Sequence, residues 1–180
     1  MVEGGAGNNA GAAMTDLADE LRSNYGRHGI HVDTPDNDEL WRLLVLQMGA
    51  VRKKVGSYRS AGYNPVVIVG HSMGACAAYE FANLIRTALV VTLDPVCEWG
   101  DGVSKDRYYP RPELAQRWIH VWLKGNFLML PDWVGPRHNA DKNLHLWNDH
   151  GEVRKMYSRV SQDVQDALSC SGRRNLRFGR

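Results

Sequence analysis

The most constraining feature of this sequence is a serine between two glycines, at a point where a strand pattern changes into a helix pattern. Pro65 to Val69 is a continuous run of apolar, mostly β-branched residues, which is typical of a strand buried on both faces. Gly70-His71-Ser72-Met73-Gly74 follows at once, and the alanine-rich segment from Met73 to Arg86 predicts a helix. A strand that passes so quickly into a helix indicates a sheet covered by helices.

The rest of the chain alternates short strands with helices, which predicts an α/β protein. Five strands are expected, at Met1–Glu3, Ile30–Val32, Pro65–Val69, Ala88–Leu93 and Trp118–Leu123. Helices are expected at Met14–Tyr25, Asn37–Tyr58, Met73–Arg86 and Glu152–Leu168. Right-handed crossovers then favour a three-layer, doubly wound, mostly parallel five-stranded sheet in the order 2-1-3-4-5. A length of 180 residues suits a single domain over residues 1–180.

Composition narrows the class of partner and the compartment. The formal net charge is only +2, so we expect no nucleic-acid partner. No apolar run approaches the ~20 residues of a membrane span, so we expect no stable membrane insertion. The three cysteines have no metal-like spacing, and the N-terminus lacks the pattern of a secretion signal. These features favour a cytoplasmic location, with a Cys97–Cys170 bridge left open, and they leave the oligomeric state unknown.

The Gly-x-Ser-x-Gly turn has the chemistry of a nucleophile site. A serine on a tight strand-to-helix turn is strained, and its hydroxyl stands above the N-terminus of the helix. Gly70 and Gly74 suit this turn because it brings neighbouring backbone close together. The backbone N–H of Met73 can donate to a developing oxyanion at the positive end of the helix dipole. Ser72 is therefore the candidate nucleophile, and the alternative is a plain turn with an incidental serine.

On these residues the chain resembles the α/β-hydrolase superfamily, and more narrowly its lipase and esterase branches. The resemblance implies a minimal, cutinase-sized α/β-hydrolase fold with a triad in the chain order Ser, Asp or Glu, His. Asp94 ends the strand after the serine turn, at the edge that carries Ser72, where lipases often have an Asp-Pro step. Asp94 is the candidate acid, and Asp132 and Asp141 are the alternatives. A purely turn-forming role for Asp94 also stays open.

The catalytic base is expected between the last predicted strand and the last helix. His138, His145 and His150 all qualify by position. His145 fits best, because lipase-like proteins often have a histidine, a few residues and then an acidic turn that opens the last helix. His150 and His138 are the alternative bases, and a structural role is open for each of the three.

The glycine-rich segment near the N-terminus resembles the oxyanion loop of the family. Gly5 or Ala6 is expected to supply the second oxyanion N–H. Only three residues precede this Gly4–Gly7 loop, so we expect a minimal hydrolase or one that is shortened at its N-terminus. These candidates complete an oxyanion hole with Met73.

Two other classes of function remain open. Gly5-x-Gly7-x-x-x-Gly11 approximates a dinucleotide fingerprint, with Asp33 as a ribose ligand, although the spacing departs from the usual one. A dinucleotide-binding protein would leave the Ser72 turn unexplained. The third class is a non-catalytic binding module on a hydrolase fold.

The expected activity is hydrolysis of a carboxylic ester. His145 accepts the proton of Ser72, Asp94 stabilises the imidazolium, and water releases the acyl group from the enzyme. The expected partner is a small-molecule acyl ester, and no metal or organic cofactor is expected. The chain length of the substrate, thioester or amide cleavage, and transfer to another acceptor stay open.

Overall fold

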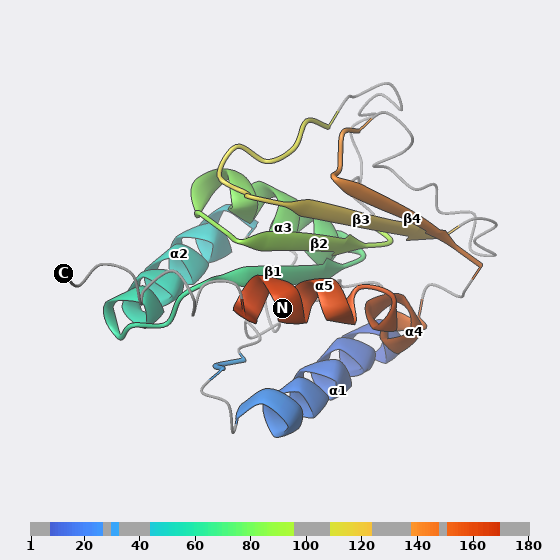
Figure 1. The fold of residues 1–180 in the computed structure, drawn as a ribbon, viewed down its shortest axis with the longest axis horizontal. Helices are drawn as coiled ribbons and strands as arrows, with labels where there is room; N and C mark the ends of the chain where they lie inside the picture. Colours follow the sequence, from blue (N-terminus) through green and yellow to red (C-terminus); the bar gives the residue numbers. More distant parts are fainter. Residues whose placement is uncertain are drawn as a thin grey trace.

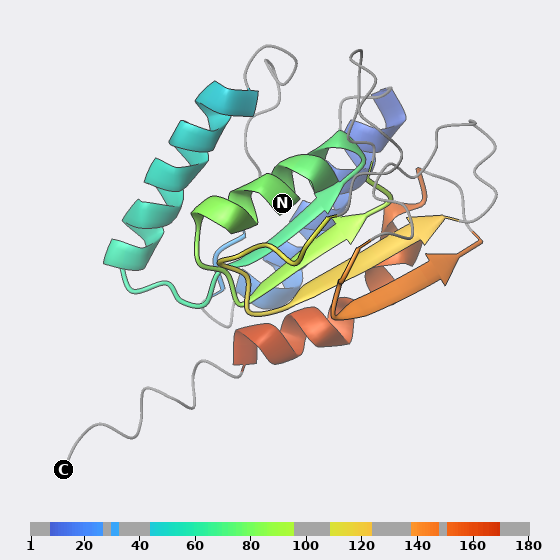
Figure 2. The ribbon, with the colours of Figure 1, turned by 90° about the horizontal axis from the view of Figure 1, so that it is seen from above.

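The computed structural model describes residues 8–26, 30–32, 44–95, 109–123, 138–147 and 151–169. Its elements are α1 (Asn8–Tyr25), α2 (Leu44–Ser60), β1 (Val67–His71), α3 (Met73–Leu84), β2 (Leu89–Leu93), β3 (Trp118–Leu123), β4 (Lys142–Leu146), α4 (Val153–Ser158) and α5 (Ser161–Ser169). The four strands form one parallel sheet in the order β1-β2-β3-β4. Helix α3 covers one face, and α1, α4 and α5 cover the other (Figures 1 and 2). The chain therefore has the three-layer α/β arrangement that its sequence predicts.

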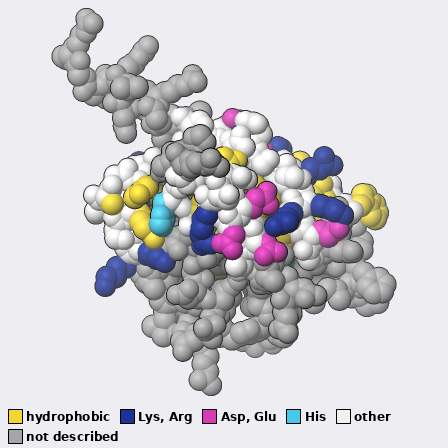
Figure 3. All heavy atoms as spheres, turned by 90° about the horizontal axis from the view of Figure 1, so that it is seen from below, with side chains coloured by type: hydrophobic (Ala, Val, Ile, Leu, Met, Phe, Trp, Pro, Cys, Tyr) yellow, Lys and Arg dark blue, Asp and Glu magenta, His cyan; other side chains and the backbone are white. Residues whose placement is uncertain are grey.

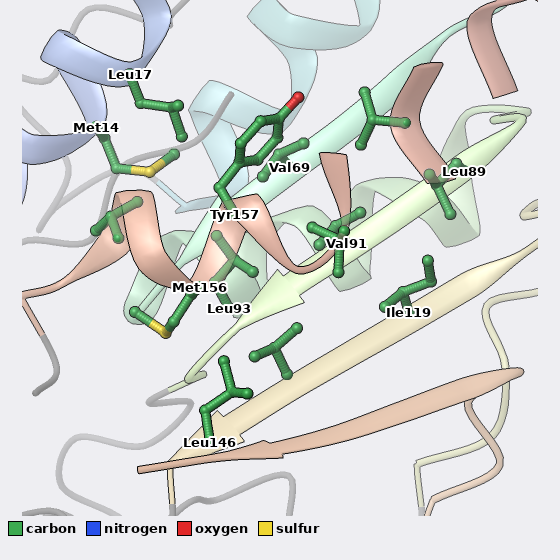
Figure 4. Close-up of a cluster of buried hydrophobic side chains, with 14 of the residues drawn as sticks. Met14, Leu17, Val69, Leu89, Val91, Leu93, Ile119, Leu146, Met156 and Tyr157 are labelled. Carbon is green, nitrogen blue, oxygen red and sulfur yellow. The ribbon is translucent and has the colours of Figure 1, made fainter. Parts of the chain in front are cut away.

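The two faces of the sheet pack in different ways. Figure 4 shows the core on the face of α1, α4 and α5, where Leu17 and Met156 of the helices and Val91 and Ile119 of the strands belong to one cluster of buried side chains. Complete burial of one such side chain contributes about 1.5–3 kcal/mol to folding. On the other face, α3 packs mainly through its small alanines, among them Ala78, which is fully buried. The small residues let α3 lie close to β1 and β2.

The parallel register brings the carboxyl ends of the strands to one edge. His71 pairs with Leu93, Leu93 pairs with Val121, and Val121 pairs with Leu144. Residues that follow β1 and β2 therefore lie beside each other, at the edge where open α/β sheets bind their ligands.

One expected strand needs correction, and one strand was not expected. Ile30–Val32 is not a strand: the Val32 carbonyl accepts a hydrogen bond from Arg22 Nε at 3.1 Å, so a helix side chain takes the bond that a sheet partner would make. The structure instead has a further strand, β4, in which only one of five residues is buried. Its polar residues interrupt any apolar run, so it was not expected as a strand. Met1–Glu3 lies outside the described residues. The expected order 2-1-3-4-5 is thus replaced, within the described residues, by four strands in sequential order.

The helices also differ from expectation at their ends. Helix α1 begins at Asn8, before the expected start, and the expected last helix is divided into α4 and α5. Between these two, Arg159 N–H donates to Met156 O and Val160 N–H donates to Tyr157 O. Hydrogen bonds between residues three positions apart form 3₁₀-type turns, which are frequent at the ends of α-helices. No helix within the described ranges is long and apolar enough to cross a membrane.

Candidate active site

Ser72 lies at the turn between β1 and α3 in a strained conformation, with φ 55° and ψ −128°. Two backbone hydrogen bonds hold the turn: Ser72 N–H donates to Leu93 O, and Ala75 N–H donates to Ser72 O, each at 3.0 Å. The side chain is fully buried, and its Oγ has no hydrogen-bond partner among the described residues. No described side chain therefore commits this hydroxyl to a structural role.

Gly70 explains how the helix can approach so closely. A Cβ atom at this position would lie 2.2 Å from the Gly74 carbonyl oxygen, 2.7 Å from Ala75 Cα and 2.7 Å from Ala78 Cβ. Two of these neighbours are backbone atoms, which cannot rotate away as the end of a side chain can. The first glycine of the turn is thus required by the contact between β1 and α3.

The start of α3 offers hydrogen-bond donors beside Ser72. The helix begins at Met73, and the first N–H groups of an α-helix have no partner within the helix. The predicted oxyanion donor Met73 is therefore at the N-terminus of a helix, next to the candidate nucleophile Ser72. The other two predicted donors, Gly5 and Ala6, lie outside the described residues and stay predictions.

Asp94 occupies the matching position at the end of β2. It is 3% exposed, its N–H donates to Val121 O at 2.7 Å, and its Oδ1 accepts from Leu123 N–H at 3.3 Å. Its φ is 41°, and among the described residues Ser72 and Asp94 are the two non-glycine residues with positive φ. Such strain is uncommon and concentrates at functional sites. The structure thus brings Ser72 and Asp94 to the ends of neighbouring strands.

His145 is not brought to this pair. It lies within β4, opposite Trp122 of β3, with the two ring centroids 3.9 Å apart, and its side chain is exposed. Its Nε2 atom is 3.4 Å from Asn143 Nδ2. Neighbouring strands are about 4.8 Å apart, so the three spacings between β1 and β4 amount to about 14 Å. Side chains across that gap cannot form the ~3 Å hydrogen bond of a catalytic pair.

Two further candidates lie around the amino end of β3, away from Ser72. The His138 ring packs 5.4 Å from that of Trp118, the first residue of β3. Asp141 Oδ2 accepts from Trp118 N–H at 2.7 Å, and its Oδ1 pairs with Arg111 at 3.3 Å. Both carboxylate oxygens of Asp141 are therefore held at the edge opposite Ser72. A polar hollow of about 410 Å³ lies here, lined by Pro110, Arg111, Asn139 and Asp141.

The last two candidates, His150 and Asp132, lie outside the described residues. By sequence, His150 follows the end of β4 at Leu146 and precedes the start of α4 at Val153. It therefore comes after the carboxyl end of a strand, as Ser72 and Asp94 do.

A buried polar network behind Asp94 was not foreseen from the sequence. Thr92 Oγ1 lies 2.9 Å from His120 Nδ1 and accepts from Trp118 Nε1 at 3.0 Å. The three side chains are almost completely buried and tie β2 to β3 two residues before Asp94. In sequence they stand among strand residues without a distinguishing pattern. No group of three or more His, Cys, Asp or Glu side chains in the described ranges is arranged to hold a metal ion.

Cys76, one helical turn after Ser72, is disulfide-bonded. Cys97 and Cys170 are the other two cysteines of the chain, and both lie outside the described residues. The Cys97–Cys170 bridge considered from the sequence lies outside the described residues. The cytoplasmic location expected from the sequence stays a prediction.

The amino ends of β3 and β4 are fixed to α5 by charge. Asp163 accepts from Arg117 at 2.6 Å and from Lys142 at 2.7 Å. Burial opposes ionisation of this carboxyl, but the hydrogen bonds and charges of Lys142 and Arg117 outweigh burial and lower the pKa of Asp163. The edge strand β4, which has little core contact, is thus anchored by an ion-pair network.

Comparison with known proteins gives a family match and matches to solved structures. The model of the "Alpha/beta hydrolase family" matches residues 11–173. A solved structure from Xanthomonas campestris pv. campestris, of a protein of the alpha/beta hydrolase superfamily, is 18% identical, and the match covers 82% of each chain with a TM-score of 0.48. No curated protein matches the chain.

Proposed function

This chain belongs to the alpha/beta hydrolase family, and we propose that it hydrolyses a carboxylic ester with Ser72 as the nucleophile. The observation that carries the proposal is the pair of buried, strained residues, Ser72 and Asp94, at the ends of neighbouring parallel strands. Positive φ at both residues costs folding energy, and such strain concentrates at functional sites. A catalytic role for both residues accounts for this cost in folding energy.

The base in this proposal is His150. A histidine that bridges Ser72 and Asp94 must come from a segment at the carboxyl edge of the sheet. His150 follows the carboxyl end of β4, whereas His145 lies within that strand and faces Trp122. The triad is then Ser72, Asp94 and His150, in the chain order of the family.

The reaction proceeds by acyl transfer to the serine. His150 accepts the hydroxyl proton while Ser72 Oγ forms a bond to the ester carbonyl carbon, and Asp94 stabilises the imidazolium. The Met73 N–H and one from Gly5 or Ala6 stabilise the oxyanion. The carbon–oxygen bond to the alcohol breaks, and His150 returns the proton to the alcohol. Water repeats the sequence on the acyl-enzyme, which releases the carboxylic acid and restores Ser72.

A fluorophosphonate probe tests the proposal directly, because it reacts with activated serines. We expect one adduct, on the peptide that contains Ser72, and no adduct in the Ser72→Ala variant. Ser57→Ala is the matched control, since Ser57 is an exposed serine of α2 that donates to Lys54 O at 2.7 Å. Labelling should be unchanged in that variant. A folded wild-type protein that neither reacts with the probe nor cleaves any ester of a chain-length series would refute the proposal and favour a binding module.

A further inference from the structure

The outer side of β4 is an unpaired sheet edge. In the order β1-β2-β3-β4 this strand is the last, and Figure 1 shows it at the edge of the sheet. Asp141 N–H, just before the strand, donates to Trp118 O at 2.9 Å, toward β3. Backbone groups of successive residues in a strand point to opposite sides, so the N–H and C=O groups of Lys142, Leu144 and Leu146 point outward. No described residue pairs with this outer side.

The edge of β4 lacks the usual protection against pairing with another chain. Natural edge strands are commonly protected by a proline, a bulge or a lysine that stays in solvent. β4 contains no proline, and its register with β3 runs through all five residues without a bulge. Its one lysine, Lys142, is bound to Asp163 of α5 at 2.7 Å. Since only one residue of β4 is buried, the core of its own chain stabilises the strand little.

The sequence of β4 is complementary to a second copy of itself. In an antiparallel pair, opposed residues whose backbone groups face each other exchange two hydrogen bonds. A two-fold axis at Leu144 places this residue opposite Leu144 of the second copy, and Lys142 opposite Leu146. All three residues then use their outward backbone groups, and no like charges are opposed. The strand therefore fits a second copy of this chain.

The same pairing brings an exposed tryptophan to a hollow. Trp147 follows β4 directly and is 76% exposed. The axis at Leu144 places Trp147 opposite Asp141 of the second copy, and opposed side chains lie on the same face of a sheet. Asp141 lines the polar hollow of about 410 Å³ together with Arg111. Tryptophan rings that fill a pocket often dominate the affinity of an interface, and an arginine beside the indole adds a cation–π contact.

The side of α1 and α4 is less suited to bind a second copy. Figure 3 shows acidic and basic side chains gathered together on the side of α1. Ion pairs in and around α1 and α4 engage several of these charges. Charged residues are depleted at the centre of protein interfaces, because their removal from water is costly. The edge of β4 is therefore the better interface.

We propose that this protein forms a two-fold dimer through antiparallel pairing of β4, with Trp147 of each copy in the hollow beside Asp141 and Arg111 of the other. The dimer joins the four described strands of each copy into one sheet. Because the strands of the two copies run in opposite directions, their carboxyl edges face opposite ways. Each copy keeps its own Ser72 and Asp94, so the dimer does not depend on the proposed ester hydrolysis.

Sedimentation velocity of the full chain, from about 1 µM to about 200 µM, tests the proposal. We expect a dimer whose fraction rises with concentration. Trp147→Ala should raise the dissociation constant by about tenfold or more, because the hollow loses the indole ring. Tyr63→Ala is the matched control, since Tyr63 is a 43% exposed aromatic residue that precedes β1, the strand at the other end of the sheet order. It should leave the dissociation constant within about twofold of the wild type.

The backbone pairing is tested at Leu144. Leu144→Pro removes the outward N–H and leaves the bonds between β4 and β3 in place. Leu144→Ala removes the same side chain and keeps the N–H. We expect the proline variant to have a dissociation constant about tenfold or more above that of the alanine variant, because the central pair loses both of its hydrogen bonds. Circular dichroism confirms that both variants are folded.

Hydrogen exchange of the wild type provides a measurement that needs no variant. The amides of Lys142, Leu144 and Leu146 should exchange more slowly at the high protein concentration than at the low one. A monomer at every concentration, a dimer unaffected by both Trp147→Ala and Leu144→Pro, or a dimer without protection of these amides would each overturn the proposal. A dimer whose Ser72 does not react with the fluorophosphonate probe would count against the hydrolase and leave the interface standing.

Discussion

The two outer strands of the four-stranded sheet, β1 and β4, differ in how their positions are fixed. Four of the five residues of β1 are buried, and the strand ends in the strained turn at Ser72. Only Leu146 is buried in β4, whose amino end is tied to α5 through Lys142 and Asp163. The proposed nucleophile is therefore positioned by close packing and the edge strand by charge. A change of volume should disturb β1, and a change of charge should disturb β4.

The difference between β1 and β4 also concerns the proposed catalytic base, His150, which follows β4 in the sequence. Ser72 and Asp94 are held by backbone hydrogen bonds at the ends of buried strands. The proposed base comes instead from the segment after a half-exposed strand. The two histidines on this side, one within β4 and one beyond it, can be separated experimentally.

The largest expected effect is on activity. His150→Ala should lower kcat/KM for an ester substrate by about 10⁴-fold or more, because the serine loses the group that accepts its proton. His145→Ala, the matched control, should stay within about threefold of the wild type, since removal of an exposed surface side chain leaves the site intact. Steady-state kinetics on purified, folded variants measure both.

The reverse pattern would contradict this assignment. If His145→Ala abolished turnover and His150→Ala did not, the position of β4 in the structure would be incompatible with the active enzyme. The triad would then be the one that sequence alone favoured.

The strand β4, which was not expected from the sequence, changes which histidine is predicted to be the catalytic base. Continuous apolar residues identified Trp118–Leu123 correctly and Ala88–Leu93 to within one residue, because both strands are buried on two faces. The alternating polar residues of Lys142–Leu146 concealed β4 at the edge of the sheet. Among the strands expected from the sequence, Trp118–Leu123 is the last, and His145 follows it. With β4, the first histidine beyond the carboxyl end is His150.

Other features of the site depend on contacts that a sequence does not display. The Gly-x-Ser-x-Gly pattern and the strand before Asp94 predicted that Ser72 and Asp94 lie at one edge, as the structure shows. The positive φ of Asp94 arises where its N–H and carboxylate bond to Val121 and Leu123, far along the chain.

A second prediction targets the packing of β1. Gly70→Ala should lower the free energy of unfolding by about 3 kcal/mol, because the added methyl group overlaps the backbone of Gly74 and Ala75. Gly56→Ala in α2 is the control: a Cβ there meets no atom within 4 Å, so the better helix propensity of alanine should raise the free energy of unfolding by about 0.5–1 kcal/mol. Urea unfolding measures both. A Gly70→Ala variant as stable as the wild type would show that α3 can move away from β1 at little cost.

The smallest effect concerns the charges that anchor β4. Asp163→Asn should lower the free energy of unfolding by about 1 kcal/mol near neutral pH, since its partners Arg117 and Lys142 are partly exposed and screened by water. The pKa of Asp163 is lower in the folded chain than in the unfolded chain. Its stabilising contribution is therefore complete above the unfolded pKa of about 3.9 and is lost as the pH falls through the folded pKa.

Urea unfolding of the wild type and Asp163→Asn at a series of pH values checks this dependence. The difference between them should persist down to about pH 4 and shrink below it, because the protonated carboxyl of the wild type then resembles the amide. Asp166→Asn, in the same helix, is the control, because its exposed carboxylate accepts only from Gln162 among the hydrogen bonds described, at 2.9 Å. It should leave the free energy of unfolding nearly unchanged. If Asp163→Asn also had no effect near neutral pH, β4 would be held by its backbone pairing with β3 rather than by charge.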